Sequence, residues 1–169
     1  MGDVPGRVAR VPHDSTAAPL RVLVYSDDSD TREQVMLALG RRPHPDLPEV
    51  EYVEVATEPV VLQQMDAGII DLAILDGEAV PAGGMGIAKQ LKDEIYRCPP
   101  ILVLTGRPQD AWLATWSRAD AAVPHPIDPM QLADTVIRLL RATRTDLVTS
   151  PATSLATSQG ASPGASAGR

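Results

Sequence analysis

Short apolar stretches alternate with amphipathic stretches five times along this chain, and that alternation limits the possible folds more than any other feature. The strand-like stretches are residues 21–25, 51–56, 70–75, 100–104 and 120–123, and the helix-like stretches are residues 30–39, 58–67, 86–96, 109–118 and 128–142. The central strands are almost continuously apolar, which is typical of parallel strands covered by helices on both faces. We therefore predict a doubly wound α/β fold around a five-stranded parallel sheet.

The last helix-like stretch carries the clearest local signals. Asp128 is suited to accept backbone N–H groups as an N-cap, and Pro129 fits the first turn of a helix. The residues that follow at helical spacing on one stripe are Leu132, Ala133, Val136, Ile137 and Leu140. We expect this stripe to pack on the sheet.

Composition divides the chain into three segments. Residues 1–19 contain three prolines and no apolar period, so we expect an irregular N-terminal arm. Residues 20–145 hold the strand and helix patterns and form the predicted domain. Residues 146–169 are rich in Ser, Ala, Thr, Gly and Pro, and we expect a low-complexity tail without a core of its own.

Net charge, hydropathy and cysteine content argue against a nucleic-acid-binding protein, a membrane-spanning protein and a disulfide-bonded secreted protein. The net charge of -7 falls within residues 20–145, where 19 acidic residues outnumber 12 basic ones, so the chain is a poor candidate for binding nucleic acid. The apolar runs are far too short to cross a membrane, and the single Cys98 suits a reducing compartment. We expect a cytoplasmic protein.

Polar side chains follow four of the predicted strands at their carboxyl ends. They are Asp27, Asp76, Thr105 and His125. In an open parallel sheet these ends meet at one edge, where ligands usually bind. Carboxylates beside a hydroxyl suit a divalent cation such as Mg²⁺ together with a phosphoryl group.

The order of these residues resembles the receiver domain of two-component response regulators. The similar segments are Arg21-Val-Leu-Val-Tyr-Ser-Asp-Asp28, Asp71-Leu-Ala-Ile-Leu-Asp76, Pro100-Ile-Leu-Val-Leu-Thr105-Gly106 and Ala119-Asp-Ala-Ala-Val-Pro-His125-Pro126. The resemblance implies the flavodoxin-like strand order 2-1-3-4-5, with Asp76 as phospho-acceptor and Thr105 as the switch hydroxyl. It also implies Mg²⁺ ligation by Asp27, Asp76 and the backbone carbonyl of Glu78.

The chain departs from the receiver pattern at several functional positions. Ser26 stands at the first acidic position of the family, where Asp28 could compensate. His125 replaces the lysine before Pro126, and we expect the His125–Pro126 peptide bond to be cis, as in the family. Ala122 replaces the aromatic switch residue. These changes predict a pseudo-receiver in which phosphorylation is impaired.

Two further features remain open to two interpretations each. Trp112 and Trp116 are four residues apart on a predicted helix, and they either pack within the fold or form an exposed partner-binding patch. The basic segment 41–45, Arg-Arg-Pro-His-Pro, is either a solvated connection or a docking site for an acidic partner. The glycine-rich segment 83–86 lacks the Lys and Ser/Thr of a phosphate loop and is interpreted as a flexible connection.

The leading hypothesis is a stand-alone, non-enzymatic docking module or accessory subunit. The sequence resembles actinobacterial stand-alone receivers encoded beside the proton-pumping NADH:quinone oxidoreductase. The resemblance implies that this respiratory complex is a candidate partner at the inner face of the plasma membrane. The alternative is a working phosphorelay receiver, phosphorylated on Asp76 by a sensor histidine kinase. A third hypothesis gives His125 a metal or redox role.

Overall fold

Five parallel strands form one sheet in the order β2-β1-β3-β4-β5, as the receiver resemblance implies. The structure is a computed structural model that describes residues 17–149. Its strands are β1 (Leu20–Tyr25), β2 (Val50–Val55), β3 (Leu72–Asp76), β4 (Ile101–Thr105) and β5 (Ala121–Pro124). Its helices are α1 (Ser29–Leu39), α2 (Glu58–Asp66), α3 (Gly84–Glu94), α4 (Ala111–Trp116) and α5 (Pro129–Thr149), with a short 3₁₀ turn at Pro108–Asp110.

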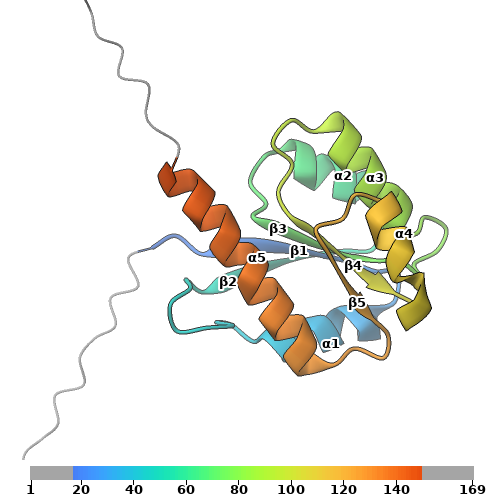
Figure 1. The fold of residues 1–169 in the computed structure, drawn as a ribbon, viewed down its shortest axis with the longest axis horizontal. Coiled ribbons are helices and arrows are strands. Elements are labelled where there is room, and N and C mark those ends of the chain that lie inside the picture. Colours follow the sequence, from blue (N-terminus) through green and yellow to red (C-terminus); the bar gives the residue numbers. More distant parts are fainter. Residues whose placement is uncertain (1–16, 150–169) are drawn as a thin grey trace, which may run out of the picture.

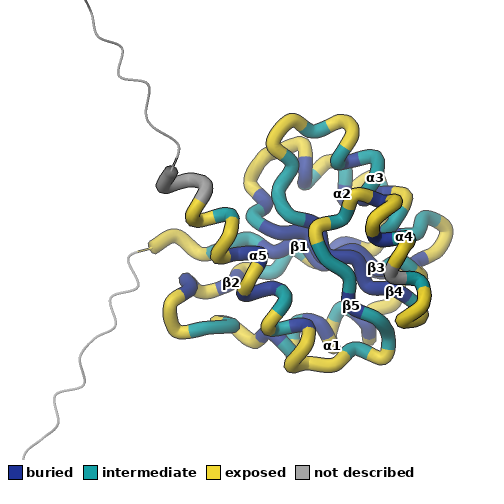
Figure 2. The backbone as a smooth tube through the Cα atoms, viewed as in Figure 1, coloured by how far each residue is buried: buried dark blue, intermediate teal, exposed yellow. Residues whose placement is uncertain are grey.

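Helices cover both faces of the sheet (Figure 1). Side chains along β1 point alternately to the two faces of the sheet. Val22 and Val24 pack with α1 and α5 on one face. Leu23 and Tyr25 pack with α2 and α3 on the other. The strands β3 and β4 are buried at every position, and Figure 2 shows the central strands as the dark interior of the molecule. Burial on both faces explains why the central strands are continuously apolar in sequence.

The strand register aligns the functional edge. Asp76 of β3 lies opposite Leu104 of β4, and Thr105 of β4 lies opposite Pro124 of β5. The backbone N–H of His125 donates to the carbonyl of Thr105 at 2.7 Å. The carboxyl ends of the strands therefore meet at one edge, as their parallel arrangement requires.

Helix α5 is longer than the sequence pattern predicts. The prediction ended it at residue 142 and began a tail at residue 146, but α5 continues to Thr149. No glycine or proline interrupts residues 143–149, and the hydroxyls of Thr143 and Thr145 donate to the carbonyls of Leu139 and Arg141 within the helix. The rest of the predicted tail, 150–169, and most of the predicted arm, 1–16, lie outside the described residues.

Helix α4 is shorter than predicted. The helical pattern over 109–118 becomes the 3₁₀ turn followed by the six residues of α4. Arg118 has a φ of 61°, a left-handed conformation that ends a helix, and the N–H of Ala119 closes the turn by donating to the carbonyl of Ala114 at 3.2 Å. The short helix keeps both tryptophans at its surface.

A membrane span is not found among the helices of residues 17–149, because none is both long and apolar enough.

The N-cap of α5 provides a test of the fold. Asp128 Oδ1 accepts the N–H groups of Met130 at 2.8 Å and Gln131 at 3.2 Å, as its position in sequence predicts. Asp128→Ala is expected to lower the free energy of unfolding by about 1 kcal/mol, because both N–H groups lose their acceptor. Urea denaturation measures the change, and Asp128→Asn, which keeps a side-chain acceptor, should lose less. Equal losses would contradict the capping role.

Candidate functional site at the carboxyl edge of the sheet

An open depression lies at the carboxyl edge of the sheet. The residues that line it are Asp27, Asp28, Thr31, Asp76, Glu78, Gly106 and His125. They come from the loops after β1, β3, β4 and β5 and from the start of α1. The structure thus brings together Asp27, Asp76 and His125, which sequence analysis placed at one edge, and it buries Thr105 next to them at the end of β4.

Asp76 is the most buried carboxylate of the site, with 4% of its surface exposed. Its Oδ2 accepts the hydroxyl of Ser26 at 2.7 Å, and its Oδ1 accepts the backbone N–H of Glu78 at 3.0 Å. A buried carboxylate needs such donors, because an unpaired charge away from water is costly. Both oxygens of Asp76 are therefore engaged by groups of the chain itself.

Ser26 fills the position at which the receiver family has an acidic residue. It is fully buried, and besides donating to Asp76 its Oγ accepts the N–H of Asp28 at 3.1 Å. A second buried carboxylate here would repel Asp76 unless a cation lay between them. The hydroxyl avoids that repulsion and donates a hydrogen bond to Asp76 instead.

The neighbouring aspartates make local contacts. Asp27 Oδ1 accepts the N–H of Val80 at 3.2 Å, which links the loop after β1 to the loop after β3. Asp28 caps α1, with Oδ1 accepting the N–H of Asp30 and Oδ2 accepting the hydroxyl of Thr31, each at 3.0 Å. Hydrogen bonds from the Asp30 N–H and then from the Thr31 hydroxyl lower the pKa of the Asp28 carboxyl. Asp28 thus lies in the depression but uses both oxygens as a helix cap.

His125 occupies the position of the family's lysine. Its Nε2 lies 3.5 Å from Asp76 Oδ1, and its peptide bond to Pro126 is cis, as the resemblance implies. Ala122, at the aromatic switch position, lies opposite Val103 in the register of β5 and β4 and is half-buried. With only a methyl group, Ala122 cannot change between buried and exposed rotamers.

Sequence analysis missed the contact between Glu78 and Gly106. A Cβ placed on Gly106 would lie 2.5 Å from the carboxyl carbon of Glu78, so the Glu78 side chain fills the space that a side chain after Thr105 would need. Sequence analysis used only the backbone carbonyl of Glu78, whereas its carboxylate also faces the depression. The sequence signal for this contact is Gly106 itself, directly after the strand-end Thr105, because a glycine at a strand end often allows another group to approach the backbone closely.

The donor set does not fit tight Mg²⁺ binding. Over residues 17–149 no group of three or more His, Cys, Asp or Glu side chains is placed to hold a metal ion. Ser26 offers a neutral oxygen where a charged one would bind a hard cation more strongly. We derive no step through Mg²⁺ or through a metal at His125.

The two tryptophans of α4 are exposed rather than packed in the core. Trp112 is 65% exposed and Trp116 is 53% exposed. Lys89 Nζ lies 5.9 Å from the ring centroid of Trp116 and 2.8 Å from an oxygen of Asp93. Of the two interpretations that the sequence left open, the structure therefore favours an exposed aromatic surface.

Comparison with known proteins identifies the family. No family model matches the chain. Two curated proteins of Mycobacterium tuberculosis, both named as uncharacterized response regulatory proteins and from strains CDC 1551 and H37Rv, are each 71% identical over 132 residues. The match covers 78% of this chain and 98% of each relative. The chain belongs to the response regulator family.

Solved structures show the same receiver fold. The signal receiver domain of a putative LuxO repressor from Vibrio parahaemolyticus gives a TM-score of 0.64 at 17% identity and covers 80% of this response regulator and 100% of that chain. The chemotaxis regulator CheY4 of Vibrio cholerae gives 0.58 at 23% identity, over 72% and 99% of the two chains. The receiver domain of a putative NarL from M. tuberculosis gives 0.61 at 21% identity, over 74% and 98%.

The buried Ser26–Asp76 hydrogen bond gives a stability prediction. Ser26→Ala is expected to lower the free energy of unfolding by about 1–3 kcal/mol, because Asp76 Oδ2 loses its donor while it stays buried. Chemical denaturation measures the loss. Ser29→Ala, at an exposed serine nearby, is the matched control and should change stability little. Similar losses in the two variants would contradict the role given to Ser26.

Proposed function

We propose that this response regulator is a non-enzymatic docking module that works without phosphorylation, as an accessory subunit of a larger complex. The observation that carries the proposal is the state of Asp76. Its two oxygens accept hydrogen bonds from Ser26 and Glu78, so the carboxylate is satisfied inside the chain before any phosphoryl donor approaches.

The group next to Asp76 supports the same conclusion. A lysine carries a permanent positive charge on a long stem, which suits it to neutralise an added phosphoryl group. His125 is shorter and carries no permanent charge. It lies 3.5 Å from Asp76 on one side, while the Glu78 carboxylate lies against Gly106 and adds negative charge to the same depression. Both features oppose the arrival of a dianionic group.

The docking surface that we propose is the tryptophan surface, formed by Trp112 and Trp116 on α4. Large exposed aromatic side chains contribute strongly to protein interfaces, because they bury much area and lose little side-chain entropy. Ala122, at the switch position of β5, lacks an aromatic ring whose rotamer could change on phosphorylation. We therefore expect the tryptophan surface to keep one conformation. A constant surface suits a constitutive subunit.

The candidate partner is the proton-pumping NADH:quinone oxidoreductase. This choice rests on the resemblance to actinobacterial receivers encoded beside that complex. Binding there would place the response regulator in the cytoplasm at the inner face of the plasma membrane, held by a protein partner.

A second function is favoured by one observation. Asp76 ends β3 at an open depression beside Asp27, with the buried Thr105 at the end of the adjacent strand, which is the arrangement expected of a phospho-acceptor. In this alternative a sensor histidine kinase phosphorylates Asp76, and Thr105 contacts the phosphoryl group.

Intact-mass spectrometry after incubation with acetyl phosphate and Mg²⁺ separates the two functions. We expect no phosphoryl adduct on the wild-type protein. The double variant Ser26→Asp/His125→Lys, which restores the receiver pattern, should gain an adduct that is lost when Asp76→Asn is added. An adduct on the wild type that Asp76→Asn removes would overturn the docking proposal in favour of the phosphorelay.

The tryptophan surface is tested by co-purification with the detergent-solubilised respiratory complex. Trp112→Ala/Trp116→Ala is expected to reduce the bound fraction at least about tenfold, since interface tryptophans are frequent hot spots. Asp76→Asn should bind as the wild type does. Leu37→Ala removes a similarly exposed apolar side chain on α1 and serves as the control. Equal binding by all four proteins would exclude this surface.

A further inference from the structure

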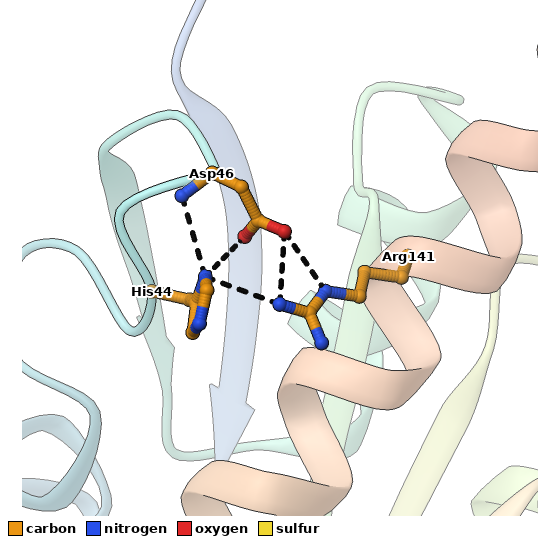
Figure 3. Close-up of polar contacts among 3 residues, drawn as sticks. All are labelled: His44, Asp46 and Arg141. Atoms are coloured by element: carbon orange, nitrogen blue, oxygen red, sulfur yellow. Dashed lines mark hydrogen bonds and ion pairs between the residues drawn. The ribbon is translucent and has the colours of Figure 1, made fainter.

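A hydrogen-bonded cluster ties the loop between α1 and β2 to the last turns of α5 (Figure 3). Asp46 Oδ2 accepts Nε of Arg141 at 3.1 Å and Nη2 at 2.8 Å. Asp46 Oδ1 contacts Nδ1 of His44, and Arg141 Nη2 lies 3.1 Å from the same nitrogen. Loss of water raises the pKa of Asp46, but the hydrogen bonds and charges of His44 and Arg141 outweigh it and leave the pKa lowered.

The loop is held at other points as well. The carbonyl of Gly40 accepts the Tyr52 hydroxyl at 2.6 Å, and the carbonyl of Arg41 accepts the N–H of Val50 at 2.8 Å. Leu47 is buried in the core. The loop also contains three prolines, Pro43, Pro45 and Pro48, which restrict its backbone. An exposed loop fixed in this way is pre-organised, and a pre-organised loop loses little entropy when it binds.

The joined segments are basic, although the whole chain is acidic. Residues 40–49 and 138–145 contain five arginines and two acidic residues, in a protein of net charge -7. The arginines are Arg41, Arg42, Arg138, Arg141 and Arg144, and we call them the arginine surface. The two acidic residues are already paired, Asp46 with Arg141 and Glu49 with Arg41.

The arginine side chains reach solvent. The side chain of Arg41 is 87% exposed although it pairs with Glu49, and Arg42, Arg138 and Arg144 are exposed as well. Arg144 also lines a groove of about 170 Å³ together with Pro48 and Leu140, so α5 and the loop meet there. Asp71 lines the same groove, and its Oδ2 accepts the backbone N–H of Arg21 at 2.7 Å. Guanidinium groups bind carboxylates in a bidentate geometry, which makes such a surface complementary to clustered Asp and Glu side chains.

We propose that the arginine surface binds an acidic segment of a partner protein. Nucleic acid is disfavoured by the overall negative charge. A lipid surface is disfavoured because, among the described residues, the large exposed apolar side chains all lie outside these two segments, and peripheral membrane binding usually needs them. The surface is distinct from the tryptophan surface and does not depend on the function proposed for it.

Fluorescence anisotropy with a labelled peptide of alternating Glu and Gly residues tests the proposal on the full-length protein. We expect binding at low salt that Arg138→Glu/Arg144→Glu weakens about tenfold or more. Arg97→Glu/Arg107→Glu makes the same change of net charge at exposed arginines elsewhere and is the matched control. Equal losses in the two variants, or no binding by the wild type, would overturn the proposal.

Asp46→Ala distinguishes the effect of the loop's conformation on peptide binding from the effect of its charge. The substitution removes a negative charge, so charge alone would strengthen binding of the acidic peptide. It also releases His44 and Arg141, so we expect binding to weaken about threefold or more if the loop must be pre-organised. Stronger binding would overturn the role of the cluster.

Two further measurements fix the class of partner. Sedimentation with phosphatidylglycerol vesicles should show no binding that depends on the arginine pair, and such binding would overturn the assignment to a protein. Trp112→Ala/Trp116→Ala should bind the peptide as the wild type does. Loss of peptide binding in that variant would show that the two surfaces are one, against the proposal.

Discussion

Burial of the central strands on both faces is the constraint on which the rest of the structure depends. The strands β1, β3 and β4 can pair in parallel only if helices cross over between them, and those helices cover both faces of the sheet. Every strand then ends at the same edge. The position of Asp76 and His125 at one depression therefore follows from the packing of residues such as Leu23 and Ile74, which have no part in the site.

The depression at the carboxyl edge is held together by hydrogen bonds within the chain. A buried carboxylate at the end of β3 needs compensation, and here hydrogen bonds from Ser26 and Glu78 provide it. The bond from Ser26 joins the loop after β1 to the end of β3 at the open depression. In this state the edge is a stable acidic surface, which is the physical basis for expecting the protein to act by binding.

Charge is unevenly distributed over the molecule. Acidic side chains gather at the carboxyl edge, around Asp27 and Glu78, whereas five arginines gather where the loop 40–49 meets α5. The length of α5 contributes to this division, because its added turns carry Arg144 past residue 142, where the sequence pattern predicts the end of the helix. A domain with two unlike surfaces can contact two regions of one large partner.

The sequence by itself determined the fold class, the order of elements and the N-cap of α5, because these depend on local periodicity and on short-range signals such as Asp128. It also placed Asp27, Asp76 and His125 at one edge, since parallel strands leave no alternative. Tertiary structure alone decided the Ser26–Asp76 hydrogen bond, the contact of Glu78 with Gly106 and the cluster of His44, Asp46 and Arg141. Those contacts join residues that are far apart in the sequence. The rotamers that bring their side chains into contact depend on the folded structure, so no local sequence pattern specifies them.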